Sequence, residues 1–344
     1  MLFAQLTFKK SLRELVTSFN SLHNCHYHIG ASTVTRSTLS YANSTRSTKV
    51  FSMLLRSIIQ NLGRKQGGEV KDLLYLLDST PISLKGLGFD KWAAEKRNPR
   101  TQGLKIHVGY MPAEALLSDF EITHANINDI SAARDMPLKK HVTYVFDKGY
   151  CDYDWWLQIE NTGSKFVTRA KKNISLKIEE IREIKDGGEH HILEDAIVTL
   201  NNKSPRARKK LTYLKPLRRV SVARPEKEPL ILITNDLASS AQEIAETYKR
   251  RWLIELLFKW LKQNLSLKTF LGRSKNAVTI QILCSLIAYS LIASIHNSGI
   301  YSGSLRELLI IIRTKLFQPI SFESPPPMRR KDPEKTQLAL RFSL

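Results

Sequence analysis

The sequence predicts an α/β fold, on three observations. Two short apolar runs rich in aromatic or branched residues are typical of buried strands, and they end in Asp78 and Asp147. A segment with helical periodicity and an unusual charged stripe follows at residues 244–265. The chain has 344 residues, of which 42% are hydrophobic, so it can bury a sizeable core in two or three domains.

Residues 1–65 are predicted to be helical. The expected helices are Leu6–Leu22, Thr35–Asn43 and Lys49–Leu62. The segment Thr33–Ser40 could open the recognition helix of a helix-turn-helix, or it could be a Ser/Thr-capped helix in a plain bundle. Gly63–Gly68 is interpreted as a linker.

An alternation of strands and helices follows the linker. Strands are expected at 73–78, 104–111, 115–122, 142–147 and 165–169, and helices at 127–135 and 152–161. Further strands are expected at Ile174–Ile181, His191–Leu200, Leu211–Val222 and Leu230–Thr234. A carboxylate at the end of a buried strand is where α/β folds place function, although a lone aspartate there is often a turn or helix cap.

The helix predicted at 244–265 carries a charged stripe on an otherwise apolar surface. At about 100° per residue, Tyr248, Arg251, Glu255 and Lys262 share an arc of about 60°. Burying these groups is costly unless they are paired, bind a metal or face a ligand. Arg251 and Glu255, four residues apart, could form an internal salt bridge. Alternatively, the stripe holds a metal and a phosphate together, because Asp78, Asp147 and Glu255 supply the oxygen ligands that Mg²⁺ prefers.

These motifs resemble those of a known family. LLDSTPI around Asp78, VFDKGYCDY around Asp147 and the spacing Tyr-(2)-Arg-(3)-Glu-(6)-Lys resemble DDE transposases of the insertion-sequence-four family. Asn126 and Asp129, in THANINDI, and the segment Gly103–His107 also fit the family pattern. The resemblance covers roughly Leu6 to Leu291.

The resemblance implies a fold and a domain order. A ribonuclease-H-like catalytic domain is expected at 70–300, with a β-rich insertion at 171–235 before the helix that bears Glu255. A helical N-terminal DNA-binding domain is expected at 1–65, shorter than in relatives, and a C-terminal helix and flexible tail at 301–344. In some relatives a Trp of the insertion stacks on a flipped base. Here the insertion has no Trp, and Tyr213 is its only Tyr.

The resemblance also implies a chemistry. Asp78, Asp147 and Glu255 are the expected catalytic residues and would hold two Mg²⁺ ions, with Mn²⁺ as an alternative. Tyr248, Arg251 and Lys262 would bind DNA phosphate. The expected reaction is cleavage of transposon ends, followed by attack of the freed 3′-hydroxyl on target DNA. The expected partners are double-stranded DNA, as inverted-repeat ends and target, and a second copy of the chain.

The charge of the chain agrees with a polyanionic partner. The formal net charge is +21, and the run Lys203–Arg219, which contains eight basic residues and no acid, is predicted to form a basic face of the insertion. Charge alone is equally typical of a ribosomal or other RNA-binding protein. Three hypotheses therefore stand: an active transposase, a truncated transposase-derived protein that only binds DNA, and a basic nucleic-acid-binding scaffold.

The remaining features concern the compartment. Cys25, Cys151 and Cys284 form no CxxC motif, so neither a zinc ribbon nor a disulfide framework is predicted, and a reducing cytoplasm fits. Val278–Ile295 is almost long and apolar enough to span a membrane, but its polar residues favour a buried core helix. The expected location is the bacterial cytoplasm, on the nucleoid.

Overall fold

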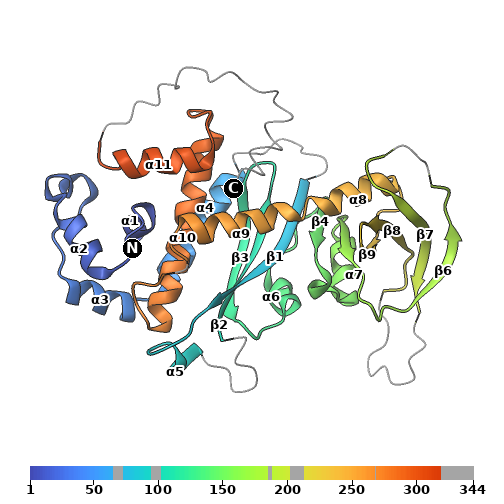
Figure 1. Ribbon diagram of the computed structural model, residues 1–344, viewed down its shortest axis with the longest axis horizontal. Helices are drawn as coiled ribbons and strands as arrows, with labels where there is room; N and C mark the ends of the chain where they lie inside the picture. Colours follow the sequence, from blue (N-terminus) through green and yellow to red (C-terminus); the bar gives the residue numbers. More distant parts are fainter. Residues whose placement is uncertain (65–72, 94–101, 185–187, 202–212, 268, 319–344) are drawn as a thin grey trace.

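A single sheet organises the molecule. The computed structural model describes residues 1–64, 73–93, 102–184, 188–201, 213–267 and 269–318. Within them a nine-stranded sheet has the order β3-β2-β1-β4-β5-β9-β8-β7-β6 (Figure 1). Its strands are β1 (Leu73–Ser83), β2 (Gly103–Met111), β3 (Leu116–His124), β4 (Val142–Phe146), β5 (Lys165–Arg169), β6 (Leu176–Ile181), β7 (Ile192–Leu200), β8 (Leu217–Arg224) and β9 (Lys227–Thr234).

The half of the sheet that contains both aspartates matches the prediction. β1 pairs antiparallel with β2 and parallel with β4, and β4 pairs parallel with β5. β1 continues to Ser83, five residues beyond its predicted end. Its pairing with β4 stops at Leu77, so that edge of β1 is open from Asp78 onward. The open edge tolerates Pro81, whose missing N–H would interrupt the ladder of a fully paired strand.

The tight antiparallel contact between β1 and β2 depends on a glycine. Gly103 begins β2 opposite Ser83, with a φ of +136°. A Cβ atom at this position would lie 2.1 Å from the carbonyl oxygen of Ile82. Only glycine adopts this conformation without a clash.

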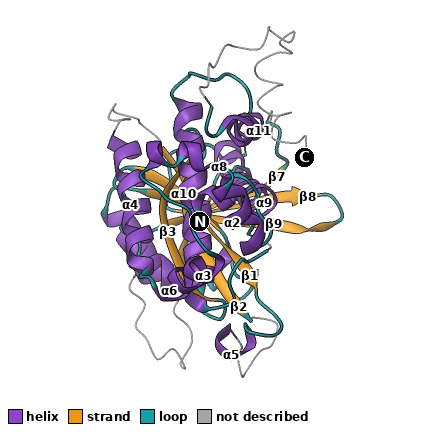
Figure 2. Ribbon diagram, turned by 90° about the vertical axis from the view of Figure 1, so that its left-hand side faces the viewer, coloured by secondary structure: helices purple, strands orange, loops and turns teal. Residues whose placement is uncertain are grey.

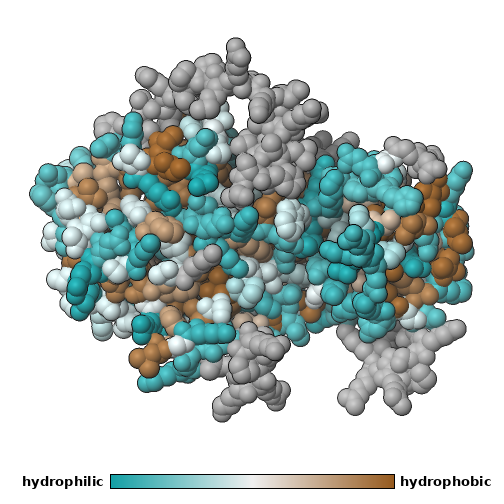
Figure 3. Space-filling model, in the orientation of Figure 1, coloured by the Kyte–Doolittle hydropathy of each residue, from teal (hydrophilic) through white to brown (hydrophobic). Residues whose placement is uncertain are grey.

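The β-rich segment joins the same sheet. β9 pairs antiparallel with β5, through Val167 and Thr234 among others, and β8, β7 and β6 follow in order. Four strands were predicted here and four are present, but β8 begins at Leu217 rather than Leu211. The described residues 213–216 form no strand, and Pro216 has no N–H to donate. Apolar atoms gather at the outer end of this segment (Figure 3), where Ile181 is 74% exposed.

The N-terminal helix predicted at Leu6–Leu22 is wrong, because two helices occupy this region. They are α1 (Leu2–Leu6) and α2 (Leu12–Asn20), separated by a turn in which Phe8 has a φ of +57°. Ser11 restarts the helix, since its side chain accepts a hydrogen bond from the backbone N–H of Glu14. The apolar periodicity continues across this turn, so the pattern alone does not reveal it.

The next two helices agree with the prediction within a few residues. They are α3 (Arg36–Thr45), capped by Thr35, and α4 (Thr48–Arg64). α2 and α3 are separated by residues 21–35, with the short 3-10 turns η1 (His23–Cys25) and η2 (Tyr27–Ile29) between them. This connection is too long for a helix-turn-helix pair formed by α2 and α3. Of the predicted linker, 63–64 are helical and 65–68 lie outside the described residues.

The apolar segment near the C-terminus is a core helix. α10 (Lys275–Asn297) is long and apolar enough to cross a membrane, but 78% of its most apolar window is buried. It lies between the N-terminal helices and β3 (Figures 1 and 2), and α11 (Leu305–Lys315) packs on it. The remaining helical elements are α5 (Asp90–Ala93), α6 (Asp129–Asp135), η4 (Lys148–Tyr150) and α7 (Tyr153–Asn161).

The predicted continuous helix at 244–265 is also wrong, because it is broken once. α8 (Ala241–Lys249) ends before Arg250, and α9 (Trp252–Asn264) then lies across β1 (Figure 1). At the break, the backbone N–H of Arg251 donates to the carbonyl of Tyr248, three residues back, which tightens the turn. Arg250 and Arg251 keep helical backbone angles, so the apolar periodicity continues across the tightened turn and the sequence pattern does not reveal it.

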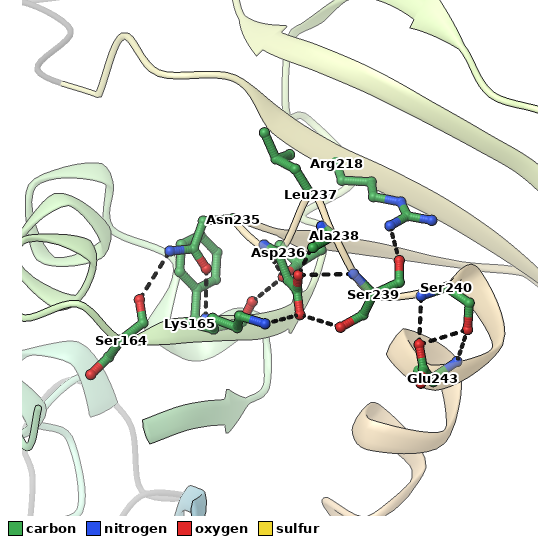
Figure 4. Close-up of polar contacts among 12 residues, drawn as sticks. Ser164, Lys165, Arg218, Asn235, Asp236, Leu237, Ala238, Ser239, Ser240 and Glu243 are labelled. Carbon is green, nitrogen blue, oxygen red and sulfur yellow. Dashed lines mark hydrogen bonds and ion pairs between the residues drawn. The ribbon is translucent and has the colours of Figure 1, made fainter. Parts of the chain in front are cut away.

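A turn centred on Asp236 directs the chain from β9 into α8 (Figure 4). The Asp236 carboxylate accepts hydrogen bonds from Lys165 Nζ at 2.8 Å, Ser239 Oγ at 2.6 Å and the backbone N–H groups of Ala238 and Ser239. Burial favours the neutral acid, but the bonds from Lys165 and Ser239 prevail and lower the pKa of Asp236 to about 2. α8 then begins with a capping box between Ser240 and Glu243.

Candidate active site

Asp78 lies on β1, one residue beyond the last pair between β1 and β4. Its Oδ1 accepts the backbone N–H of Ser79 at 2.8 Å, and its Oδ2 accepts Arg251 Nη1 at 3.2 Å. The side chain is 19% exposed. Burial raises the pKa of Asp78 to about 6, opposed by Ser79 and Arg251 and reinforced by the charge of Glu255. The neighbouring groups therefore do not fully compensate the carboxylate for its loss of water.

Arg251 joins Asp78 to Glu255. Its Nη2 donates to Glu255 Oε1, one helical turn further along α9. The helix-internal salt bridge that the sequence allowed is therefore present, but the guanidinium also reaches a strand 173 residues away. Burial lowers the pKa of Arg251, but the opposing effect of Tyr248, Asp78 and Glu255 prevails and the net shift is upward. Its Nε is buried and makes no hydrogen bond within the described residues.

Asp147 reaches the same region from β4. It follows the last residue of that strand and precedes η4, and its Oδ1 accepts the hydroxyl of Tyr248 at 3.4 Å. Tyr248 is 8% exposed, and burial raises its pKa to about 12. The Arg251 guanidinium lies 5.9 Å from the centre of the Tyr248 ring. The three acids are thus connected through these two neighbouring side chains of the charged stripe.

Lys262 completes the predicted set. It lies in the last turn of α9 and lines a hollow of about 450 Å³ together with Asp78 and Glu255. The other lining residues are Ser79, Thr80, Phe258, Lys259 and Gln263. A hollow lined by both acids and lysines suits a phosphate held next to a cation.

The acids fit a divalent cation in kind. Asp78, Asp147 and Glu255 offer only carboxylate oxygens, which are the ligands that Mg²⁺ and Mn²⁺ prefer. Within the described residues, no three His, Cys, Asp or Glu side chains lie close enough together to hold an ion in this arrangement. A guanidinium lies between two of the acids instead, so metal binding requires Arg251 to move. The raised pKa of Asp78 marks a carboxylate that a dication would stabilise.

The structure describes part of the insertion's expected DNA-contacting surface. Tyr213 is fully buried and its hydroxyl donates to Glu160, so it is a core residue, in keeping with the absence of a base-stacking aromatic residue from the insertion sequence. Of the predicted basic face at Lys203–Arg219 the structure describes residues 213–219, and each cation there has an acidic partner. These pairs are Lys215 with Glu160, Arg218 with Asp195 and Arg219 with Glu194. Residues 203–212 lie outside the described residues.

The structure also shows residues that sequence reasoning did not place in the site. Trp252 begins α9 beside Arg251 and is 49% exposed, although the apolar pattern of this helix predicted burial. Asp129, Lys105 and Ser79 form a polar cluster behind Asp78. The segments THANINDI and GLKIH contain two of these residues, so the sequence carried the signal without assigning it a role.

Comparisons with known proteins show which family this chain resembles. Residues 70–291 match the family model described as Transposase DDE domain. A protein of Sinorhizobium fredii named as the transposase y4zB is 39% identical over 296 residues, which cover 84% of this chain and 80% of the relative. One of Synechocystis, named as a transposase for the insertion sequence element IS4SA, is 26% identical and covers 79% of this chain and 75% of the relative.

A solved structure shares the fold. The piggyBac transposase, in a synaptic complex with hairpin DNA, has a TM-score of 0.51 at 13% identity, covering 95% of this chain and 72% of that one. The DDE domain implies divalent metal dependence and DNA as the substrate. On the match over residues 70–291 and the 39% identity over most of its length, the chain belongs to the DDE transposases, enzymes that cut and join DNA strands.

Proposed function

We propose that this chain is a transposase of the insertion-sequence-four type, which cuts the ends of its own element and joins them to target DNA. The single observation that carries the proposal is Arg251, which joins Asp78 of β1 to Glu255 of α9. Tyr248 extends the same connection to Asp147. The spacing Tyr-(2)-Arg-(3)-Glu-(6)-Lys thus brings Tyr248, Arg251 and Glu255 to Asp147 and Asp78, which supports a three-acid site.

The proposed architecture follows the sheet. A ribonuclease-H-like core would comprise residues 70–300, with the antiparallel strands β6–β9 as an insertion at 171–235 before the helix with Glu255. The support is the order β3-β2-β1-β4-β5 with two parallel pairings. Residues 1–65 would form the helical DNA-binding domain, and residues 301–344 would form a C-terminal helix and tail.

The proposed metal ligands are Asp78, Asp147 and Glu255, holding two Mg²⁺ or Mn²⁺ ions between the sheet and α9. When bound, these ions would neutralise the phosphate and lower the pKa of the attacking hydroxyl group. The carboxylates contribute position, because Asp78 and Asp147 directly follow the last pair between the parallel strands β1 and β4. The phosphodiester is already anionic, so alignment and charge neutralisation are the main requirements of the reaction.

Arg251, Tyr248 and Lys262 are the proposed phosphate-binding residues. Arg251 holds the acids together in the metal-free protein and, once displaced from them, would bind a phosphate next to the ions. Lys262 lines the hollow beside Glu255 and would bind the same phosphate from the other side. The exposed ring of Trp252, adjacent to Arg250 and Arg251, offers a surface on which a base can stack.

The proposed substrate is duplex DNA, as the inverted-repeat ends and as target. The formal net charge of +21 supports a long polyanionic partner touched at several places. Two copies of the chain would hold the two ends of one element, because both ends must be cut for the element to move. In the cell this activity would occur on the nucleoid, in the bacterial cytoplasm.

The test is strand cleavage of a labelled duplex that carries the element's terminal repeat. We expect cleavage at the end of the repeat with Mg²⁺, none with EDTA and none with Glu255→Gln. Glu246→Gln is the matched control, since Glu246 is a partly exposed acid on α8 that pairs with Lys249 and His190 and should leave cleavage intact. Cleavage by Glu255→Gln at the wild-type rate would refute the three-acid site. End binding without cleavage would instead indicate a DNA-binding protein derived from a transposase.

A further inference from the structure

A polar cluster lies beside Asp78, around the next residue of β1. Successive side chains of a strand point to opposite faces, so the hydroxyl of Ser79 is directed away from the Asp78 carboxylate, although Ser79 also lines the hollow that contains Glu255. The hydroxyl of Ser79 donates to Asp129 Oδ1 at 2.6 Å. Asp129 is the first residue of α6, and the reaction proposed above assigns it no role.

Strand β2 adds two more side chains to this cluster. Lys105 Nζ donates to Asp129 Oδ1 at 3.1 Å and to the carbonyl of Ile127 at 2.8 Å. His107 lies directly opposite Ser79 in the sheet, and its Nδ1 is 3.7 Å from Asp129 Oδ1. Burial lowers the pKa of His107 to about 4, so the ring is neutral at neutral pH. Lys105 is thus the cation that balances Asp129.

The other oxygen of Asp129 packs against the turn that follows Asp147. A Cβ atom at Gly149 would lie 2.9 Å from Asp129 Oδ2, closer than real Cβ atoms approach their neighbours. Glycine is therefore what lets the carboxylate sit on this turn. One side chain thereby contacts the residue after Asp78 and the second residue after Asp147.

These contacts begin where the sheet stops fixing the two acids. The ladder between β1 and β4 ends with the pair Leu77 and Phe146, and Asp78 and Asp147 are the next residues along the chain. Beyond that pair no β1–β4 pairing holds the strand ends at a set distance. Asp129 supplies the connection that the ladder lacks, through Ser79 on one side and Gly149 on the other.

We propose that Asp129 is a positioning residue that fixes the separation of Asp78 and Asp147. It does so by contacting Ser79, which follows Asp78, and Gly149, in the turn that follows Asp147. The proposal rests on the metal-binding role assigned above to these two acids. Displacement of catalytic groups by about 1 Å lowers rates by about a hundredfold. Loss of Asp129 should therefore weaken metal binding and cleavage while the fold and DNA binding persist.

The experiment compares Asp129→Ala and Asp129→Asn with Asp119→Ala. Asp119 is a matched control, because it is a buried carboxylate of the same sheet that pairs with Arg56 at 3.2 Å. It lines a separate hollow with Leu73 and Val142, at the far ends of β1 and β4 from the proposed site. Mn²⁺ binding to the full chain is measured by electron paramagnetic resonance, together with end cleavage, melting temperature and duplex binding in EDTA.

We expect Asp129→Ala to raise the Mn²⁺ dissociation constant about tenfold and to lower the cleavage rate about a hundredfold. Asp129→Asn should lie between it and the wild type, since the amide oxygen still accepts from Ser79. Duplex binding in EDTA should stay within about twofold of wild type for both. Asp119→Ala should lower the melting temperature and leave the Mn²⁺ dissociation constant unchanged.

Gly149→Ala provides a second, independent variant. Its methyl group would push the Asp129 carboxylate away and should reproduce the weaker Mn²⁺ binding. In the Asp129→Ala background the same methyl group meets no carboxylate oxygen, so Gly149→Ala should add no further loss. Such non-additivity is the signature of two residues that act through one contact.

Three results would overturn the positioning role. They are wild-type Mn²⁺ binding and cleavage in Asp129→Ala, an equal loss of Mn²⁺ binding in Asp119→Ala, or fully additive losses for Gly149→Ala. The parent variants Asp78→Asn and Asp147→Asn show which proposal has failed. If they retain Mn²⁺ binding and cleavage, the metal site itself is wrong. If they lose both while Asp129→Ala does not, only the role of Asp129 is wrong.

Discussion

Two buried aspartates of this chain are held in opposite ways. Asp236, 10% exposed, accepts four hydrogen bonds from Lys165, Ala238 and Ser239, and its pKa falls to about 2. Asp78, 19% exposed, accepts one backbone N–H and one guanidinium, and burial raises its pKa to about 6. The fold satisfies Asp236 completely and leaves Asp78 partly unsatisfied.

The opposite pKa shifts distinguish an acid that stabilises the fold, Asp236, from one whose charge is suited to a ligand, Asp78. A shift of one pKa unit corresponds to about 1.4 kcal/mol, so ionised Asp236 stabilises the fold by about 2 kcal/mol and ionised Asp78 destabilises it by about 3 kcal/mol. A chain selected for stability alone would not retain Asp78 in this position. The cost is explained if a cation joins Asp78 during the reaction.

The largest expected effect comes from Asp78→Asn. End cleavage should fall at least a hundredfold, because a metal ligand is lost. The same change should raise the melting temperature of the metal-free protein, since it removes a buried charge. Added Mn²⁺ should raise the melting temperature of the wild type and not of the variant. Cleavage assays and thermal melts check both, and a lower metal-free melting temperature would contradict the comparison.

Replacement of Arg251 should separate metal binding from DNA binding. Without its guanidinium between Asp78 and Glu255, Arg251→Gln should bind Mn²⁺ at about tenfold lower concentration, because no cation competes for the acids. Cleavage should nevertheless fall, since a phosphate contact is lost, and the KM for the DNA end should rise about tenfold. Spectroscopic Mn²⁺ titration and cleavage kinetics measure the two effects. Weaker Mn²⁺ binding would show that Arg251 supports the metal site instead of occupying it.

Asp236→Asn is the opposite case. The amide keeps the size of the side chain but loses the ion pair with Lys165, so the free energy of unfolding should fall by about 2 kcal/mol. For a chain of this length that lowers the melting temperature by several degrees, at about 2–4 °C per kcal/mol. At a temperature where the variant is folded, Mn²⁺ binding and the cleavage rate should be those of the wild type. A loss of Mn²⁺ binding would mean that the turn also shapes the site.

The smallest expected effects concern the pH dependence of the free energy of unfolding. This dependence should differ in sign between Asp78 and Asp236. The pKa of Asp78 lies above its unfolded value of 3.8, so the metal-free fold gains stability as the pH falls from about 6 to 4. The pKa of Asp236 lies below 3.8, so its contribution is present above pH 3.8 and is lost as the pH falls toward 2.

Buried His107 has the opposite effect to Asp78 on the pH dependence of stability between about pH 6 and 4. Its pKa of about 4 lies below the usual 6.5, so the unfolded chain takes up this proton first. The free energy of unfolding therefore falls as the pH falls from 6.5 to 4. The effect of Asp78 is therefore measured as the difference in unfolding free energy between wild type and Asp78→Asn. We expect this difference to shrink from pH 7 to pH 4. A difference independent of pH would contradict the raised pKa of Asp78.

Sequence reasoning succeeded where a residue's role depends on its immediate neighbours. The strand before Asp147 and the stripe from Tyr248 to Lys262 are local patterns, and the structure has them at or near their predicted places. It failed where helical hydrogen bonding is interrupted without a change of pattern, as at Phe8 and at Arg250, because apolar periodicity continues through both turns.

Long-range partners were the other limit. The charge of the run Lys203–Arg219 predicted a basic face, but the acids that pair with its described cations come from α7 and β7. The hydroxyl of Tyr213 likewise donates to Glu160, 53 residues earlier. Asp129 contacts Ser79 across 50 residues, and only the fold shows that the two meet. These pairings depend on strand order, which composition and spacing do not encode.

The direct pairing of β5 with β9 has a mechanical consequence. β6–β9 continue the same sheet, because β9 pairs with β5 and β5 pairs with β4, the strand that precedes Asp147. We therefore expect a load that a bound molecule places on β6 or β7 to reach β4 through successive hydrogen-bonded ladders. The position of Asp147, directly after β4, would then respond to what binds at the far edge of the sheet.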